Sequence, residues 1–109
     1  MTQFASSMPH DRFSTFAEFY PFYLSEHRTP ACRRLHFVGT ATVIVLLVAA
    51  LLTMRWWLFA LVPLAGYSFA WAGHFWFEHN RPATFAHPFY SLFADFVMFR
   101  DMLIGRIRF

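Results

Sequence analysis

The sequence predicts an all-α fold, a small integral membrane protein built on a transmembrane helical hairpin. The chain has 109 residues, of which 58% are hydrophobic and 14% are charged, whereas about 25% of the residues in an ordinary soluble domain are charged. Two long apolar stretches are joined at Arg55, which is the pattern of two membrane helices with a tight turn between them. We expect a single domain over residues 1–109, with a flexible N-terminus at residues 1–11.

The two apolar stretches are residues 37–54, "FVGTATVIVLLVAALLTM", and residues 56–77, "WWLFALVPLAGYSFAWAGHFWF". Each is long enough to cross a bilayer, which takes about 20 apolar residues. Pro63 allows a kink of the kind that membrane helices tolerate. Three small residues of the second stretch would allow close contact with the first: Gly66, Ala70 and Gly73.

Shorter amphipathic segments flank the hairpin. Residues 12–26, "RFSTFAEFYPFYLSE", predict a short interfacial helix that Pro21 keeps from continuing far. Residues 88–105, "PFYSLFADFVMFRDMLIG", contain three charges, and each charge at the bilayer centre costs roughly 2.5–3.5 kcal/mol. The pattern therefore favours a helix along the membrane or packed on the hairpin over a third span.

The charges predict how the hairpin is oriented. All nine cations are arginines, and only Arg55 lies at the turn, while the other eight lie on the side of the termini. By the positive-inside rule both termini are cytoplasmic. Arginines placed beside apolar segments also explain the net charge of +3 without a nucleic-acid partner. Cys32 has no second cysteine for a disulfide, and we identify no cleavable signal peptide.

Two histidines should meet across the hairpin. His36 lies 19 residues before Arg55, and His74 lies 19 residues after it. At about 1.5 Å per helical residue, both are roughly 28 Å from the turn, near the cytoplasmic boundary. Neutral imidazole is a common ligand for iron, zinc and copper. Equal depth therefore makes His36 and His74 candidate ligands of one metal ion.

Other polar residues lie near this pair in the sequence. His27 precedes Pro30, which limits a continuous helix, so the segment can fold back toward the site. Glu78 follows His74 on the same helical face, whereas His79 points about 100° away. His87 could return to the same region, and Asp95 is a candidate partner for an arginine. The string H-x-x-x-E-H is no zincin motif, but histidines joined by a carboxylate suit an open non-haem iron site.

Three functions remain open on the residues alone. The first is a non-haem iron enzyme at the membrane surface. The second is an electron carrier in which His36 and His74 ligate one haem axially. The third is a structural or adaptor membrane protein without chemistry, in which the histidines bind headgroups or backbone.

Two stretches of the sequence resemble the Mpo-like family, which includes 2-hydroxy fatty acid dioxygenases and many small bacterial members. They are "FYLSEHRTPACRRLHFVGT" (Phe22 to Thr40) and "AGHFWFEHNRPATFAHPFYSLFADFVMF" (Ala72 to Phe99). The resemblance extends over residues 18–105 and combines H-x8-H, an apolar hairpin and G-H-x3-E followed by Pro-Ala.

The resemblance implies an Fe(II)-dependent dioxygenase that shortens 2-hydroxy fatty acids by one carbon, in alpha-oxidation. Its partners would be a 2-hydroxy fatty acid or related lipid, dioxygen and the lipid of a bacterial plasma membrane. Its metal ligands map onto His27, His36 and His74, and His79 receives no ligand role. Glu78 follows in the motif, and an interfacial arginine would meet the substrate carboxylate. The predicted catalytic residues are Glu78 and Arg81, with Arg33 and Arg34 as further candidates for the carboxylate.

Overall fold

The computed structural model describes residues 13–82 and 86–109, and within these ranges every regular element is helical. The order along the chain is α2 (Phe16–Ser25), α3 (Pro30–Thr53), the 3-10 helix η1 (Trp56–Ala60), α4 (Leu61–Ala72), the π-helix η2 (Gly73–Glu78) and α5 (Pro88–Leu103). The predicted all-α fold is confirmed. The flexible N-terminus expected over residues 1–11, with His10 in it, lies outside the described residues.

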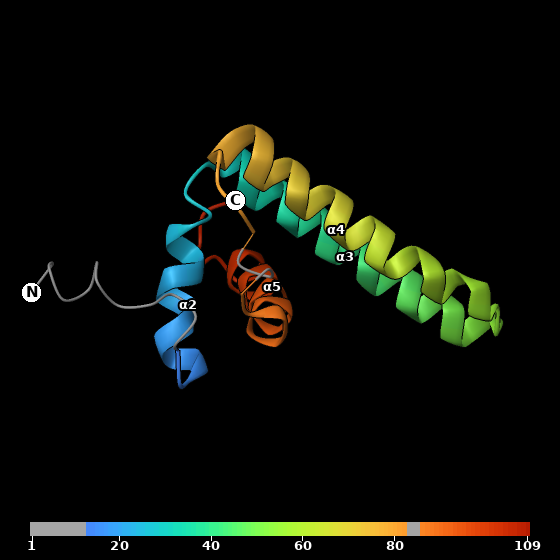
Figure 1. The fold of residues 1–109 in the computed structure, drawn as a ribbon. Coiled ribbons are helices and arrows are strands. Elements are labelled where there is room, and N and C mark those ends of the chain that lie inside the picture. Colours follow the sequence, from blue (N-terminus) through green and yellow to red (C-terminus); the bar gives the residue numbers. More distant parts are fainter. Residues whose placement is uncertain (1–12, 83–85) are drawn as a thin grey trace, which may run out of the picture.

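A long helical hairpin forms the body of the molecule. Helix α3 runs out, the chain turns at Met54 and Arg55, and η1, α4 and η2 run back beside α3 (Figure 1). The two arms contain 24 and 23 residues and are apolar enough to cross a membrane. Along the arms large apolar side chains face outward: Leu52 is 80% exposed and Leu64 is 63% exposed. Exposed apolar surface of this extent is typical of a face that lipid or another protein covers.

Helix α3 begins earlier than the sequence predicted. It starts at Pro30 and not at residue 37, because the Thr29 hydroxyl accepts a hydrogen bond from the Cys32 N–H at 3.2 Å and caps the helix. Pro30 occupies the first turn, where its missing N–H is harmless. As expected, no continuous helix joins His27 to His36, because α2 ends at Ser25 and α3 begins at Pro30. His36 therefore lies well inside α3.

Helix α2 is the short helix expected within residues 12–26, but it continues through Pro21 to Ser25. The Thr15 hydroxyl caps its first turn by accepting from the Glu18 N–H at 3.2 Å. A proline inside a helix removes one backbone hydrogen bond and costs about 3 kcal/mol. The burial of Phe19 and Tyr23 on the opposite side outweighs that loss, because each large side chain contributes about 1.5–3 kcal/mol when fully buried.

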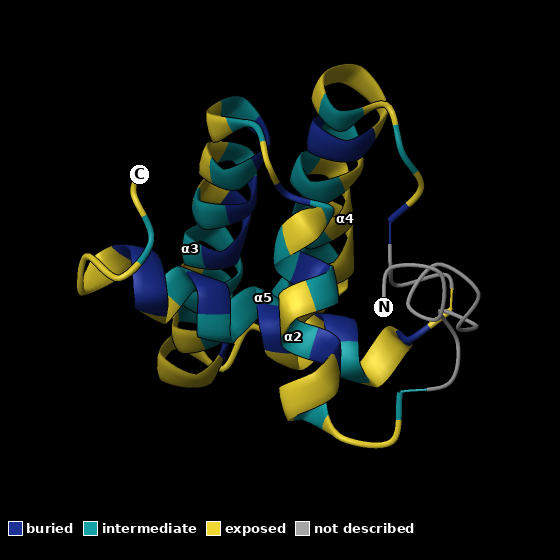
Figure 2. Cartoon of the chain, turned by 90° about the vertical axis from the view of Figure 1, so that its left-hand side faces the viewer, coloured by how far each residue is buried: buried dark blue, intermediate teal, exposed yellow. Residues whose placement is uncertain are grey.

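Helices α2 and α5 pack together beside the open end of the hairpin (Figures 1 and 2). Their shared core consists of Phe19, Tyr23, Ala94, Met98 and Met102. Helix α5 also contacts α3, so it packs on the hairpin, which was the favoured alternative to a third span.

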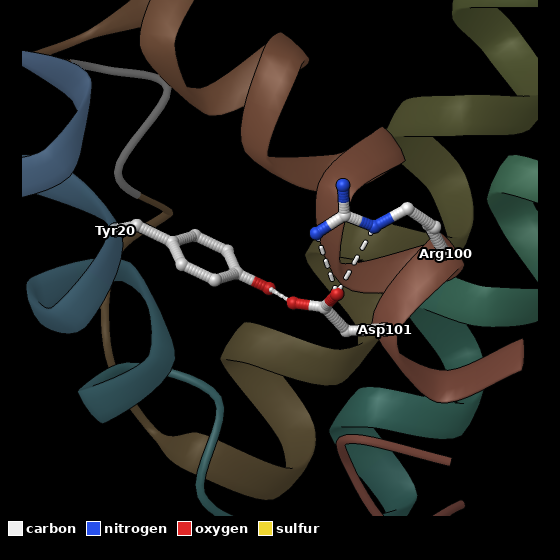
Figure 3. A network of polar contacts seen from close by, with 3 residues as sticks. All are labelled: Tyr20, Arg100 and Asp101. Carbon is white, nitrogen blue, oxygen red and sulfur yellow. Dashed lines mark hydrogen bonds and ion pairs between the residues drawn. The ribbon is translucent and has the colours of Figure 1, made fainter. Parts of the chain in front are cut away.

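A polar network fastens α2 to the end of α5. The Tyr20 hydroxyl donates to one oxygen of the Asp101 carboxylate at 2.8 Å, and Arg100 pairs with the other oxygen at 2.8 Å (Figure 3). The Asp101 backbone carbonyl accepts from the N–H groups of Arg106 and Ile107. One buried residue therefore ties α2, α5 and the C-terminal segment together.

Glycines let the two arms approach closely. A Cβ on Gly39 would lie 2.9 Å from the Phe69 Cβ, and a Cβ on Gly73 would lie 2.9 Å from the Cys32 Sγ. Gly66 is less crowded, with the Val43 Cγ2 at 3.3 Å. The expected close contact at Gly66 and Gly73 is confirmed, and Gly39 adds a third.

Replacing Gly39 should therefore destabilise the hairpin. We expect Gly39→Ala to cost about 1–3 kcal/mol, because the Phe69 Cβ is attached to backbone and cannot move away alone. Gly66→Ala is the matched control, since the Val43 side chain can shift by a few tenths of an ångström. Thermal unfolding in detergent micelles measures both. Equal unfolding temperatures for the two variants would contradict the close approach at Gly39.

Candidate metal centre

Four buried side chains converge where the hairpin meets the end of α2: His27, Cys32, His36 and His74. Their ligand atoms all lie within 4.8 Å of one another. The His36 and His74 rings are 4.9 Å apart between centroids, which confirms the predicted pairing across the hairpin. The His27 ring lies 4.3 Å from His36 and 4.4 Å from His74. The turn between α2 and α3 thus brings the third histidine back to the other two.

Backbone carbonyls orient the first two imidazoles. The Nδ1 of His27 lies 2.6 Å from the Tyr23 carbonyl oxygen, and the Nδ1 of His36 lies 3.0 Å from the Cys32 carbonyl oxygen. A carbonyl can only accept, so in each ring Nδ1 carries the proton. The opposite nitrogen, Nε2, is then left with a bare lone pair.

A side-chain amide orients the third imidazole. The Nδ1 of His74 lies 2.7 Å from the Asn80 Oδ1. The Asn80 Nδ2 donates to the Glu26 carbonyl and to the Glu26 carboxylate, both at 3.2 Å. Two acceptors on Glu26 therefore determine which end of the Asn80 amide faces His74. The His74 Nδ1–H donates to that oxygen, and its Nε2 is also a lone pair.

Three such lone pairs in one buried place suit a metal ion. Metal-bound histidines almost always donate their other ring N–H to a carbonyl or carboxylate, as all three do here. The Nε2 atoms of His27 and His36 are 3.0 Å apart. Two ligand atoms that are each bonded to one metal ion at about 2.1 Å, with a right angle between the bonds, are ~3.0 Å apart. Burial, followed by the neighbouring His36 and His74, lowers the pKa of His27 well below its usual value. His27 is thereby kept neutral, as a ligand must be.

Cys32 was not predicted as part of the cluster. It lies one helical turn before His36, and its Sγ is 3.7 Å from the His36 Nδ1. The spacing C-x3-H puts the two side chains on one helical face, a signal that is readable only when α3 is known to begin at Pro30. Gly73 matters here as well, because it lets η2 approach Cys32.

Glu78 has a structural contact outside the four-residue cluster. Its carboxylate accepts a hydrogen bond from the Thr29 N–H, directly before α3. Thr29 in turn caps α3 through its hydroxyl, so Glu78 and Thr29 together resemble a capping box made between two elements. This contact ties the end of η2 to the start of α3 and aligns His74 with His36.

The remaining histidines lie apart from the cluster. His79 is exposed and ends η2 with a φ of 60°, and it has no place among the four grouped residues, as expected. His87 is buried against the Phe13, Phe19 and Tyr90 rings. Neither of its ring nitrogens has a hydrogen-bond partner among the residues that the structure describes.

Two of the candidate arginines bind backbone carbonyls. Arg33 donates to the carbonyl of Arg28 at 2.7 Å. Arg34 donates to the carbonyl of Phe109 at 3.0 Å and also covers its ring. Arg81 is exposed and directly precedes Pro82, which lines the cavity described next.

A cavity of about 270 Å³ opens from the histidines into the groove between the hairpin arms. One wall is apolar and comes from α3 and α4, with Val43, Val62 and Gly66 among its residues. The other wall is formed by α2 and α5 and contains three polar residues: Tyr23, Ser91 and Asp95. The expected arginine partner of Asp95 is replaced by Tyr23, whose hydroxyl donates to the carboxylate. Tyr67 also lines the cavity.

The model of one protein family matches residues 13–107, and its description is "2-hydroxy-palmitic acid dioxygenase Mpo1-like". The match covers most of the chain, and the protein therefore belongs to the Mpo1-like family. The curated proteins and the solved structures contain no match.

Removing one cluster histidine should abolish metal binding. We expect the purified protein to retain a divalent metal ion, and His36→Ala or His74→Ala to lose it, because two imidazoles hold a metal far more weakly than three. His79→Asn is the control, since asparagine tolerates the positive φ at that position. Elemental analysis of each variant gives the metal content. Stoichiometric metal in both alanine variants would exclude these residues as ligands.

Asp95 should make stability depend on pH. Burial raises its pKa to about 7, against the opposing hydrogen bond from Tyr23. The folded chain therefore binds a proton that the unfolded chain has already lost above its ordinary pKa of about 3.9. Stability should fall as the pH rises between these two values and then level off. Asp95→Asn should remove this slope from the thermal unfolding temperature.

Asp101 is the internal comparison for that measurement. Although burial opposes it, the hydrogen bonds from Arg100 and Tyr20 lower the pKa of this carboxyl. The contribution of Asp101 to the stability of the fold should therefore be lost as the pH falls. Its effect on stability thus has the opposite sign to that of Asp95. A slope that Asp95→Asn leaves unchanged would contradict the assignment to Asp95.

Proposed function

We propose that the protein is an Fe²⁺-dependent dioxygenase that shortens 2-hydroxy fatty acids by one carbon. The observation that carries the proposal is the set of three Nε2 lone pairs, each oriented by an acceptor on Nδ1. An electron carrier or an adaptor would have no need of such a set. The family description, which names a 2-hydroxy-palmitic acid dioxygenase, agrees with this chemistry.

Iron would be held by His27, His36 and His74. Three neutral imidazoles leave coordination positions for other ligands, as in non-haem iron sites. When bound, the iron would supply Lewis acidity and a site for dioxygen. The chain's own contribution is to keep the rings neutral, buried and correctly turned. Cys32 lies at the edge of the same site.

The cavity suits a lipid substrate. Its polar end lies at the histidines, and its apolar wall follows the groove between the hairpin arms. An acyl chain in this groove would gain about 0.8 kcal/mol for each buried CH₂. The head of a 2-hydroxy fatty acid would then lie at the histidines while its tail extends toward the membrane.

The proposed reaction balances without another reductant. A 2-hydroxy acid, R–CH(OH)–COOH, and dioxygen give R–COOH, carbon dioxide and water. The bond between C1 and C2 breaks, the substrate loses four electrons, and dioxygen takes them up. The only requirements are therefore the lipid, dioxygen and the metal.

Glu78 and Arg81, predicted as catalytic residues, take different proposed roles, Glu78 as a positioning residue and Arg81 toward the substrate. Glu78 lies one turn after His74 and is held by the Thr29 N–H, so it would act on the site mainly by keeping η2 in place. Arg81 precedes the cavity residue Pro82 and would attract the substrate carboxylate toward the opening.

We propose that the hairpin spans a bacterial inner membrane with both termini in the cytoplasm. Eight of the nine arginines lie on the side of the termini and of the metal centre, as the positive-inside rule requires. The protein would then take its substrate directly from membrane lipid, and it would bind no nucleic acid.

The haem alternative fits less well. A porphyrin between His36 and His74 would need the space that the His27 ring occupies, only 4.3 Å and 4.4 Å from the two rings. An absorption spectrum without a Soret band would exclude the carrier.

Oxygen uptake tests the proposed reaction. Protein purified without oxygen, loaded with Fe²⁺ and given 2-hydroxypalmitate should consume oxygen and form the acid that is one carbon shorter. His74→Ala should reduce the rate by at least about 100-fold, because the metal is lost. His79→Asn should keep the wild-type rate. Wild-type protein that holds iron but consumes no oxygen with 2-hydroxy acids of several lengths would refute the proposal.

A further inference from the structure

The polar wall of the cavity has a feature that metal binding does not explain. Ser91 and Asp95 lie one helical turn apart on α5, so they present their side chains on the same face. Both line the cavity that the three histidines also line. They are not among the residues grouped around the metal centre.

The Ser91 hydroxyl lacks a hydrogen-bond partner among the residues that the structure describes. The side chain is buried, with 4% exposure. A serine in a helix usually donates to the carbonyl four residues earlier, as Ser68 does to Leu64 at 2.5 Å. Leaving a buried hydroxyl without a partner is unfavourable. The Ser91 hydroxyl is therefore available to a polar group in the cavity.

Asp95 is positioned to accept a hydrogen bond there. The Tyr23 hydroxyl donates to its Oδ1, which fixes the carboxyl on the cavity wall. A carboxyl group has capacity for several hydrogen bonds, so Oδ2 can accept another. The wall thus offers a hydroxyl and a carboxylate oxygen side by side.

From this wall we infer that Ser91 and Asp95 form a subsite that recognises the hydroxyl group of the substrate, and so select hydroxylated over plain fatty acids. A hydroxyl both donates and accepts. Its O–H would donate to Asp95, while its oxygen would accept from Ser91. The inference rests on the proposed function, because it specifies how the same cavity tells its substrate from the commoner unsubstituted lipid.

The charges of the wall argue for a hydroxyl and against a carboxylate at this place. No arginine of the described residues lines the cavity, so the wall holds no cation for an acid group. An unsubstituted chain would leave the Ser91 hydroxyl without a partner and would offer no donor to the Asp95 Oδ2. Buried polar groups discriminate strongly against ligands that cannot pair with them.

Binding measurements without turnover test the subsite. The iron-loaded protein, kept free of oxygen, is titrated with 2-hydroxypalmitate and with palmitate, and the ratio of the two dissociation constants is compared between variants. Because the metal is the same throughout, its own preference for a hydroxy acid cancels from this comparison. We expect Ser91→Ala to lower the preference for 2-hydroxypalmitate by about threefold to tenfold, as for one neutral hydrogen bond. At pH 8.5, above the Asp95 pKa of about 7, Asp95→Asn should lower it by about tenfold or more, as for a charged acceptor.

In both variants the affinity for palmitate should stay near the wild-type value. Ser68→Ala is the matched control, since it removes an exposed serine hydroxyl of α4 that bonds within its own helix. Retained iron in each variant verifies that the fold and the metal centre are intact. Equal losses for both lipids, or an unchanged ratio in both variants, would overturn the subsite.

The outcome separates this inference from the proposed reaction. Wild-type protein that prefers 2-hydroxypalmitate through Ser91 and Asp95 but consumes no oxygen would keep the subsite and refute the dioxygenase. If the wild-type protein consumes oxygen and both variants keep the full preference for 2-hydroxypalmitate, the dioxygenase is supported and the subsite is refuted.

Discussion

The architecture of this protein depends on the way in which three imidazoles are held by their Nδ1 atoms. Each Nδ1 meets a carbonyl oxygen, from Tyr23, Cys32 or Asn80, and each Nε2 is thereby turned toward the other two rings. The acceptors come from α2, from α3 and from the chain after η2. The geometry of the cluster is correct only when all three segments are in place, so the centre forms with the fold and not before it.

The surrounding contacts serve the same alignment. Glu78 binds the N–H of Thr29, and Asn80 binds Glu26, so the end of the second arm is fastened to the turn between α2 and α3. Gly73 permits this because a side chain there would collide with Cys32. On the far side, Asp101 joins α5 to Tyr20 of α2 (Figure 3). The polar contacts are concentrated at the open end of the hairpin, while the long arms depend on apolar packing.

Much of the fold and of the candidate metal centre could be predicted from the sequence, and the parts that could not have physical causes. The pairing of His36 and His74 follows from counting on both sides of Arg55, because two antiparallel helices of equal rise bring equal counts to equal depth. The break before Pro30 predicted that the His27 segment folds back toward the site, and the family resemblance gave His27 its role as a ligand. Cys32 was missed because it was considered only as a disulfide partner, and its place beside His36 depends on α3 beginning at Pro30. Asn80 and Ser91 could not be found, since their roles depend on side chains that are distant in the sequence, on Glu26 and on the cavity wall.

The position of the centre follows from the same division between polar and apolar regions. A metal site needs neutral, buried donors and fixed hydrogen bonds behind them, and lipid alone cannot supply those bonds. At the open end of the hairpin, α2, α3 and the chain after η2 supply them, and α5 forms part of the cavity wall beside the site. The groove between the arms nevertheless reaches the histidines. A molecule that is apolar along most of its length and polar at one end matches both regions at once, and the Ser91–Asp95 wall lies where its polar end would meet the protein.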